Sequence, residues 1–290
     1  MHTMRRLIVN ADDFGLHSSV NHGIIEGYRQ GCLRSTSFVA AGRAAEEAAA
    51  LAHDNPGLGV GIHLTLVAER PILPPEQIPS LLGENGYLLP DHTAFIRRYI
   101  SGGIRKEELY AECEAQILFA LKLGVRLSHI DSHQHLHVLP GVISIVLALA
   151  KKYNLSKMRL PAEPLGFLGG YPSPVGRYIA KCGLTFCAWT AQNAIRCAGV
   201  STPNHFFGMI AGGHLFEKHF LSILRALPDG VSEIMVHPGK DNSVLDNIYH
   251  WGYHWEEELA SLTSLEAMQI IKQRQIDLIS YRELSDGEIL

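Results

Sequence analysis

The amino-acid sequence predicts an α/β protein with one irregular, TIM-like (β/α) barrel domain that spans residues 1–290. Apolar runs alternate with helix-like segments along most of the chain, which is typical of a parallel sheet covered by helices. Histidines and aspartates directly follow several of these runs, as expected at the carboxyl ends of barrel strands. A doubly wound open sheet also collects residues at its strand ends, so it stays open as the alternative fold.

The overall composition excludes several classes of protein. A hydrophobic content of 47% with 19% charged residues indicates a globular protein with a substantial core. The net charge of −4 gives no electrostatic reason to bind nucleic acid. No apolar run reaches the ~20 residues that a transmembrane segment needs. The five cysteines include no Cys-x-x-Cys pair, which suggests reduced thiols and a cytoplasmic location.

Seven apolar runs are the expected strands: Leu7–Ala11, Thr36–Ala40, Gly59–Leu64, Ser128–Ser132, Met158–Pro161, Phe186–Thr190 and Glu233–His237. Seven further segments are the expected helices: Ser19–Gln30, Ala44–Asp54, Lys106–Leu123, Val142–Tyr153, Pro174–Lys181, Leu215–Ala226 and Leu265–Arg274. Ser18 or Ser19 is suited to cap the first helix, and Gly124 is suited to end the third.

The segment 68–103 departs from this alternation and reads as a loop insertion. Its first 23 residues include five prolines. Because it follows His63 directly, the segment would hang over the same face as that histidine. We expect either a lid or substrate wall, or a structural excursion packed against the side of the barrel.

Three clusters of histidine and aspartate mark the ends of predicted strands. They are Asn10-Ala11-Asp12-Asp13-Phe14-Gly15, Gly61-Ile62-His63-Leu64 and Asp131-Ser132-His133-Gln134-His135-Leu136-His137. Two histidines and one carboxylate can hold a divalent metal ion and leave positions open for water and substrate. Imidazole suits zinc, nickel, cobalt or iron, whereas the carboxylate keeps magnesium or manganese possible.

The paired aspartates and the alternating histidines each allow more than one interpretation. Asp12 and Asp13 can divide the work, one binding the metal ion and the other taking a proton from water. A lone aspartate there would usually be a turn or capping residue. In an extended segment His133, His135 and His137 would all point to one side. Some of them can then be substrate contacts, partners of a ligand or plain core histidines.

Two further residues lie at the ends of later strands. His237, in Met235-Val236-His237-Pro238-Gly239, can act as general acid for the leaving group. Arg159 can orient the base or bind the substrate, although a structural ion pair explains it nearly as well. The chain lacks a Gly-x-Ser-x-Gly elbow, a Walker-type phosphate loop and a Gly-x-Gly-x-x-Gly fingerprint. Hydrolysis by metal-activated water is therefore the leading class.

Two rival functions remain. A metal-dependent phosphoesterase or sugar isomerase on the same barrel could use the same ligands. The isomerase would usually need more carboxylates and a lysine, and the phosphoesterase more metal ligands or basic groups. A carbohydrate- or metal-binding protein without catalysis would lack the base or the acid, yet both Asp12 and His237 are present.

Taken in order, the three clusters and Val236-His237-Pro238-Gly239 resemble the motifs of the YdjC-like carbohydrate deacetylases, which include chitooligosaccharide deacetylases. The resemblance runs from residue 7 to about residue 240. It implies a (β/α) barrel-like fold, one divalent ion (Mg or Zn), and hydrolysis of the N-acetyl group of an amino sugar. By motif matching, Asp13, His63 and His133 would be the metal ligands, Asp12 the base and His237 the acid that protonates the departing amine. The remaining active-site neighbours would be Asp131, His135, His137 and Arg159.

Two later stretches look closest to the hopanoid-biosynthesis-associated subgroup called HpnK. They are Thr202-Pro203-Asn204-His205-Phe206-Phe207-Gly208 and Trp251-Gly252-Tyr253-His254-Trp255-Glu256-Glu257-Glu258-Leu259. This likeness implies an N-acetylglucosaminyl hopanoid as substrate, with peripheral membrane contact and a homo-oligomer as further expectations. Apolar loops around Phe167-Leu168 and from Phe206 to Ile210 could accommodate the lipid body, and ordinary core packing explains them equally well.

Overall fold

A computed structural model describes residues 5–170 and 172–285. Seven parallel strands form one curved sheet in the order β4-β3-β2-β1-β6-β5, and β7 pairs with the first half of β1. Their bounds are β1 (Arg5–Phe14), β2 (Ser35–Phe38), β3 (Gly59–Leu64), β4 (Leu127–Ser132), β5 (His205–Phe207), β6 (Gly230–Val236) and β7 (Asp277–Ile279). This half-barrel confirms the α/β class and is consistent with a (β/α) barrel-like fold.

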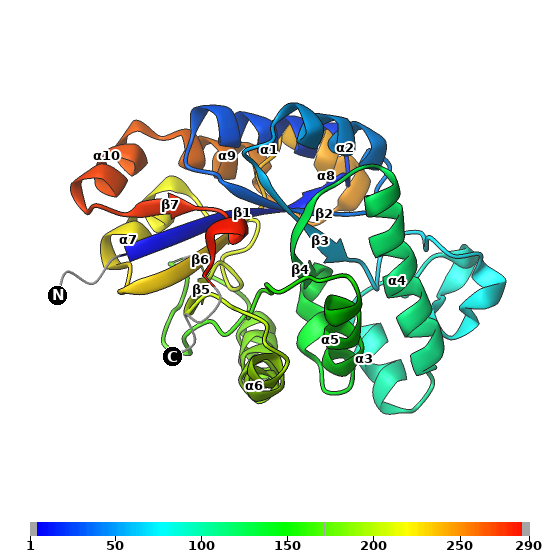
Figure 1. The fold of residues 1–290 in the computed structure, drawn as a ribbon. Helices are drawn as coiled ribbons and strands as arrows, with labels where there is room; N and C mark the ends of the chain where they lie inside the picture. The colour runs from blue at the N-terminus through cyan, green and yellow to red at the C-terminus, as the bar shows by residue number, and fades with distance from the viewer. Residues whose placement is uncertain (1–4, 171, 286–290) are drawn as a thin grey trace.

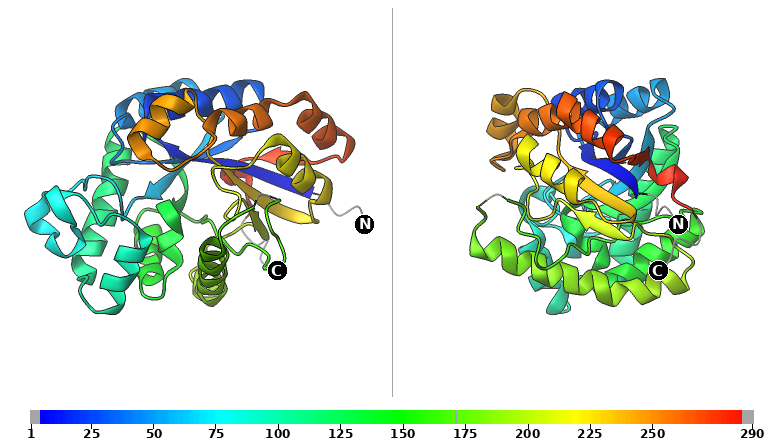
Figure 2. Two further views of the ribbon diagram at one scale, coloured as in Figure 1. Left: turned by 180° about the vertical axis from the view of Figure 1, so that it is seen from behind. Right: turned by 90° about the vertical axis from the view of Figure 1, so that its left-hand side faces the viewer.

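The helices cover the sheet on two sides (Figures 1 and 2). Their bounds are α1 (Ser18–Gln30), α2 (Ala45–Asp54), α3 (His92–Ile100), α4 (Lys106–Lys122), α5 (Val142–Lys152), α6 (Val175–Cys197), α7 (Glu217–Ala226), α8 (Asn242–Tyr249), α9 (Trp255–Thr263) and α10 (Leu265–Gln273). In Figure 1, α1, α2, α9 and α10 lie above the sheet, and α3, α5 and α6 lie below it. Within the described ranges, no helix combines the length and apolar character needed to cross a bilayer.

Two predicted strands are wrong. Phe186–Thr190 lies inside α6, whose buried residues Lys181, Thr185 and Ala188 recur with the helical period that the short aromatic run concealed. Met158–Pro161 forms only an isolated parallel bridge between Met158 and Ile130, because Pro161 has no N–H to donate and the Ala162 N–H turns back to Leu160. The sequence reading also missed β5, β7, α3, α8 and α9.

Of the two helix ends predicted from the sequence, the one at Gly124 is confirmed and the cap of the first helix is wrong. The N-terminal cap of α1 is His17, whose Nδ1 accepts the N–H of Ser19 at 3.1 Å, and neither Ser18 nor Ser19 fills that place. Gly124 follows α4 as expected, with φ of +81° in the left-handed region that glycine adopts without strain.

The segment 68–103 is an ordered excursion, not a bare loop. It contains three short 3-10 turns and α3, and it packs through the buried side chains of Ile78, Leu81 and Phe95. Glu112 of α4 accepts the backbone N–H groups of Ile72 and Leu73, which fastens the segment to the body. The segment is therefore packed on the body of the protein, and α3 additionally lines a cavity described below.

All five cysteines are free. Cys32 and Cys113 are buried, as small apolar residues would be, whereas Cys182 and Cys197 are exposed on α6.

Candidate active site

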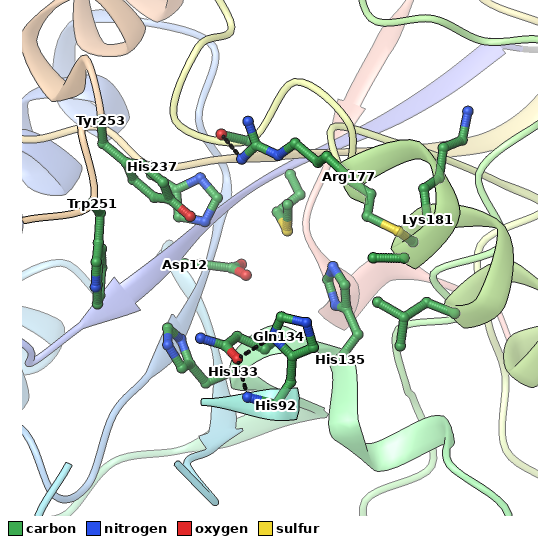
Figure 3. A pocket seen from close by; sticks show the side chains of 15 residues that line it. Asp12, His92, His133, Gln134, His135, Arg177, Lys181, His237, Trp251 and Tyr253 are labelled. Atoms are coloured by element: carbon green, nitrogen blue, oxygen red, sulfur yellow. Dashed lines mark hydrogen bonds between the residues drawn. The ribbon is translucent and has the colours of Figure 1, made fainter. Parts of the chain in front are cut away.

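The predicted site residues converge at the carboxyl edge of the sheet. Asp12 and Asp13 lie near the end of β1, His63 lies in β3, and His237 directly follows β6. Parallel strands bring these ends together at one edge. Asp12, His133 and His237 all line one pocket, shown in Figure 3.

Asp13, His63 and His133 form a cluster suited to a metal ion. The Asp13 Oδ1 atom lies 3.7 Å from His63 Nε2 and 3.3 Å from His133 Nδ1. That oxygen is buried and has no hydrogen-bond partner. Burial alone would raise the pKa of the Asp13 carboxyl, but His133 and His63 hold it well below its ordinary value. An unpartnered carboxylate oxygen between two imidazole nitrogens fits a divalent ion.

The imidazole of His63 is oriented by a second carboxylate. Its Nδ1 lies 2.8 Å from Asp131 Oδ1, which leaves Nε2 directed at Asp13. A carboxylate behind a ligating histidine is the usual means of fixing its ring and tautomer. Burial alone would lower the pKa of His63, but Asp131 and Asp12 raise it to about 9.

Arg159 is the fully buried centre of the charge network. Its guanidinium donates to both oxygens of Asp12, at 2.6 and 2.7 Å, and lies 2.9 Å from Asp131 Oδ2. Its Nε donates to Glu233 at 2.9 Å. Asp12, His63 and Asp131 also lie close enough to hold an ion. The guanidinium is already paired with both of those carboxylates, so the cluster around Asp13 is the better fit.

The three alternating histidines do not share one side. Residues 133–138 form a 3-10 turn in which Gln134 and His135 take left-handed φ angles of +54° and +58°. His135 therefore lines the pocket with His133, whereas His137 bonds Ser132 and the Arg159 carbonyl. The extended geometry expected from the sequence is wrong. Burial and the Arg159 charge hold the pKa of His135 well below its ordinary value, and its buried Nδ1 has no partner.

His237 stands against Glu258, a buried residue of α9. Glu258 accepts the backbone N–H of His237 at 2.5 Å and that of Leu215 at 3.0 Å. The His237 Nδ1 atom is buried, lacks a hydrogen-bond partner and lies 4.0 Å from Glu258 Oε2. Burial raises the pKa of Glu258, which the His237 charge opposes. Glu258 belongs to a motif quoted for the HpnK likeness, but no role was predicted for it.

The rest of the pocket was not predicted. The whole pocket has a volume of about 300 Å³. Figure 3 shows Trp251 and Tyr253 on one side of it, with Arg177 and Lys181 of α6 on another. The Trp251 ring lies 5.6 Å from that of His133. The alternating aromatics from Tyr249 to Trp255 were a usable signal for this wall, because such a run rarely serves a solvent face.

A buried carboxylate also fixes the loop on the far side of the pocket. Glu163 accepts the backbone N–H groups of Gly208, Met209 and Ile210 at 2.8 to 3.1 Å. Burial raises the pKa of Glu163, and the ammonium of Lys181 at 3.5 Å opposes that rise. Three converging N–H groups on one carboxylate hold this wall in place.

Comparisons with known proteins agree with the motif resemblance. The profile described as YdjC-like protein matches residues 6–273. Carbohydrate deacetylases from Thermoanaerobacter pseudethanolicus and Geobacillus stearothermophilus are each 33% identical, over 96% of this chain and 98% of theirs. A crystal structure from Enterococcus faecalis V583, provisionally described as a cellobiose-phosphate cleavage protein, matches with a TM-score of 0.74 at 30% identity, covering 97% of this chain and 99% of that one. The chain belongs to the YdjC-like protein family.

Proposed function

We propose that this protein is a metal-dependent hydrolase that removes the N-acetyl group from an N-acetylglucosamine-containing glycoconjugate. The observation that carries the proposal is the unpartnered Asp13 oxygen between two imidazoles, beside Asp12 on the pocket wall. The two relatives named carbohydrate deacetylase support the reaction class. The residues are also those that amide hydrolysis requires.

Asp13, His63 and His133 would hold the ion, and Asp12 would serve as base. When bound, a magnesium or zinc ion supplies Lewis-acid chemistry, polarising a carbonyl and acidifying water. Asp12 Oδ2 lies 3.9 Å from His63 Nε2, so it faces the same space. Arg159 donates hydrogen bonds to both oxygens of Asp12 and so fixes the orientation of the carboxylate. Asp12 then accepts the proton of the attacking water as the new C–O bond forms.

His237 would protonate the leaving group. The imidazole lines the same pocket as Asp12, and Glu258 fixes its backbone. As the C–N bond breaks, a proton from the His237 ring passes to the sugar nitrogen, and acetate and a free amine result. His135 and Trp251 line the same pocket, where the first can contact the substrate and the second offers an aromatic ring against which a sugar can stack.

An apolar cleft supports a lipid-linked sugar as the substrate. The cleft has a volume of about 410 Å³, lies between α3 and α6, and shares His92, Ala180 and Leu184 with the catalytic pocket. A further sugar of a chitooligosaccharide would find few polar partners there, whereas an N-acetylglucosaminyl hopanoid would bury its ring system. Phe206 and Ile210 are buried in the core, so ordinary packing accounts for that loop. Such a substrate would bring the protein to a membrane surface.

The phosphoesterase and isomerase alternatives receive less support. Both need a basic group that is free to meet the substrate. Lys181, the lysine on the pocket wall, donates to the carbonyls of Pro164 and Phe167. Arg177 donates to the carbonyl of Gly212 at 2.7 Å.

The test is acetate release by protein loaded with zinc or magnesium. We expect release from an N-acetylglucosaminyl lipid to exceed release from N-acetylglucosamine oligomers. Release from the oligomers alone would replace the lipid with a chitooligosaccharide and leave the reaction intact. No acetate from either substrate, with the ion bound and the fold intact, would contradict the proposal and favour phosphate release or isomerisation.

A further inference from the structure

The outer side of α6 carries an apolar stripe. Val175, Ile179, Phe186 and Trp189 are 74%, 67%, 63% and 47% exposed. Their spacing of four, seven and three residues places them on one face of the helix, opposite the buried face around Ala188. Single exposed apolar residues are ordinary, but a continuous row of four that includes two aromatic rings marks a surface that binds something.

The same part of the chain is free of acidic side chains. Residues 92–106 and 164–216, which include α3 and α6, contain none of the 29 Asp and Glu residues and seven of the 25 Lys and Arg residues. Their formal charge is therefore +7, whereas the whole chain carries −4. Two of these cations are paired with acids just outside the ranges, Lys181 with Glu163 and Arg105 with Glu108. A charge of +5 is then left to complement an anionic surface.

The apolar cleft lies along the edge of this face. Gly183 and Cys187 line it from α6, and Ile100, 79% exposed, lines it from the end of α3. The cleft adjoins the catalytic pocket, with which it shares the lining residues His92, Ala180 and Leu184. Figures 1 and 2 place α3 and α6 on the same side of the molecule, across the sheet from α10.

We propose that this face, defined by Val175, Ile179, Phe186 and Trp189 with Ile100, docks on the surface of an anionic lipid bilayer. Apolar side chains would enter the boundary between headgroups and acyl chains, while the basic residues of both elements are attracted to the negative surface. The cleft would then open toward the lipid, giving an apolar group a path to the pocket without crossing water. The docking stands independently of the reaction catalysed, because its observations lie outside the catalytic residues.

The test is sedimentation of the full chain with vesicles of phosphatidylcholine plus phosphatidylglycerol, compared with phosphatidylcholine alone. We expect binding to the anionic vesicles that weakens with salt. Ile179→Ser together with Phe186→Ser should weaken it by roughly tenfold or more, since two large apolar groups stay in water. Leu265→Ser is the matched control, because Leu265 on α10 is 81% exposed and lies on the other side of the sheet. It should bind as the parent does.

Trp189 supplies a second readout. Of the three tryptophans, Trp255 is buried and Trp251 lines the catalytic pocket. The part of a blue shift of tryptophan emission on vesicles that comes from Trp189 should therefore be lost in Trp189→Phe. Absence of vesicle binding by the parent chain, or equal loss in Leu265→Ser, would overturn the proposal. So would a dimer that dissociates in the Ile179→Ser, Phe186→Ser variant while no vesicles are bound, since the face would then join two copies.

Discussion

The two sides of the catalytic pocket are built by different means. On one side Asp12, Asp13 and His63 come from parallel strands, and a buried network around Arg159 holds Asp12 directly and His63 through Asp131. On the other side, α6, the loop after β5 and the aromatic segment before α9 supply the wall, which the buried carboxylates Glu163 and Glu258 hold. Strand ends therefore position the proposed catalytic side chains, whereas α6 and the irregular segments determine which substrates the pocket admits.

The largest effect should come from the proposed ligands His63, on β3, and His133, in the turn that follows β4. We expect His63→Ala and His133→Ala each to abolish ion binding and turnover together, because a site with two remaining ligands is too weak to hold the ion. Equilibrium dialysis with metal analysis and an acetate assay measure both quantities. His53→Ala, an exposed histidine of α2, is the control and should change neither. Full turnover in His63→Ala or His133→Ala would show that the replaced histidine is not needed to hold the ion.

Replacing Glu258 should show how far the opposite side acts on the chemistry. In Glu258→Gln the backbone N–H of His237 loses its charged partner, and the imidazole can shift. A misplacement of this kind lowers kcat by up to about 10²-fold. Ion affinity should not change, and Glu258→Asp should recover part of the loss if position is the cause. An unchanged kcat with a raised KM would instead make Glu258 part of the substrate wall.

A smaller effect is expected at the aromatic wall. Trp251→Ala should raise KM by about tenfold or less and leave kcat nearly unchanged, since one stacking contact contributes about 1 kcal/mol beyond its buried area. Trp251→Phe keeps an aromatic ring, so its KM should lie between that of the parent and that of Trp251→Ala. Steady-state kinetics on one soluble acetylated sugar measures KM and kcat separately. A fall in kcat alone would mean that Trp251 acts on His133, whose ring it faces at 5.6 Å.

Replacing Glu233 should have the smallest effect on turnover. Its main effect should be on how the free energy of unfolding depends on pH. Burial raises the pKa of Glu233 to about 7, although Arg159 and Tyr281 oppose that rise. The folded state therefore holds this proton more tightly than the unfolded chain does. The free energy of unfolding contributed by the group is present below the ordinary pKa and is lost as pH rises toward 7.

Glu233→Gln removes this titration and keeps one of the two acceptor oxygens, so the amide oxygen can still accept from Arg159 while the NH2 group meets the Tyr281 hydroxyl oxygen. Between acid and neutral pH, the free energy of unfolding of the variant should rise relative to that of the parent by up to about 3 kcal/mol. This relative gain should level off above pH 7. Urea unfolding at about pH 5 and about pH 8 measures it. A gain that shrinks as pH rises would contradict the assignment.

The strand side of the pocket could be predicted from the sequence, and the opposite side could not. Asp12, His63 and His237 each follow an apolar run, and parallel strands carry such ends to one edge whatever the loops do. The 3-10 turn that separates His135 from His137 depends on two left-handed residues, for which Gln134 and His135 give no sequence signal.

The helix α6 shows the other limit. Its short aromatic run around Phe186 has strand propensity, and only packing over 23 residues makes it helical. Arg177 and Lys181 reach the pocket through that packing and carry no motif. Glu163 could not be found either, because its three N–H partners lie about 45 residues further along the chain.

The most direct test of the account compares Asp12→Asn with Asp13→Asn, two neighbouring carboxylates given different work. Ion stoichiometry and acetate release would be measured on both variants. We predict that Asp13→Asn loses the ion and all turnover, whereas Asp12→Asn keeps the ion and loses roughly 10² to 10⁴-fold in turnover. An Asp12→Asn variant with near-parental turnover, or an Asp13→Asn variant that still binds the ion fully, would contradict it.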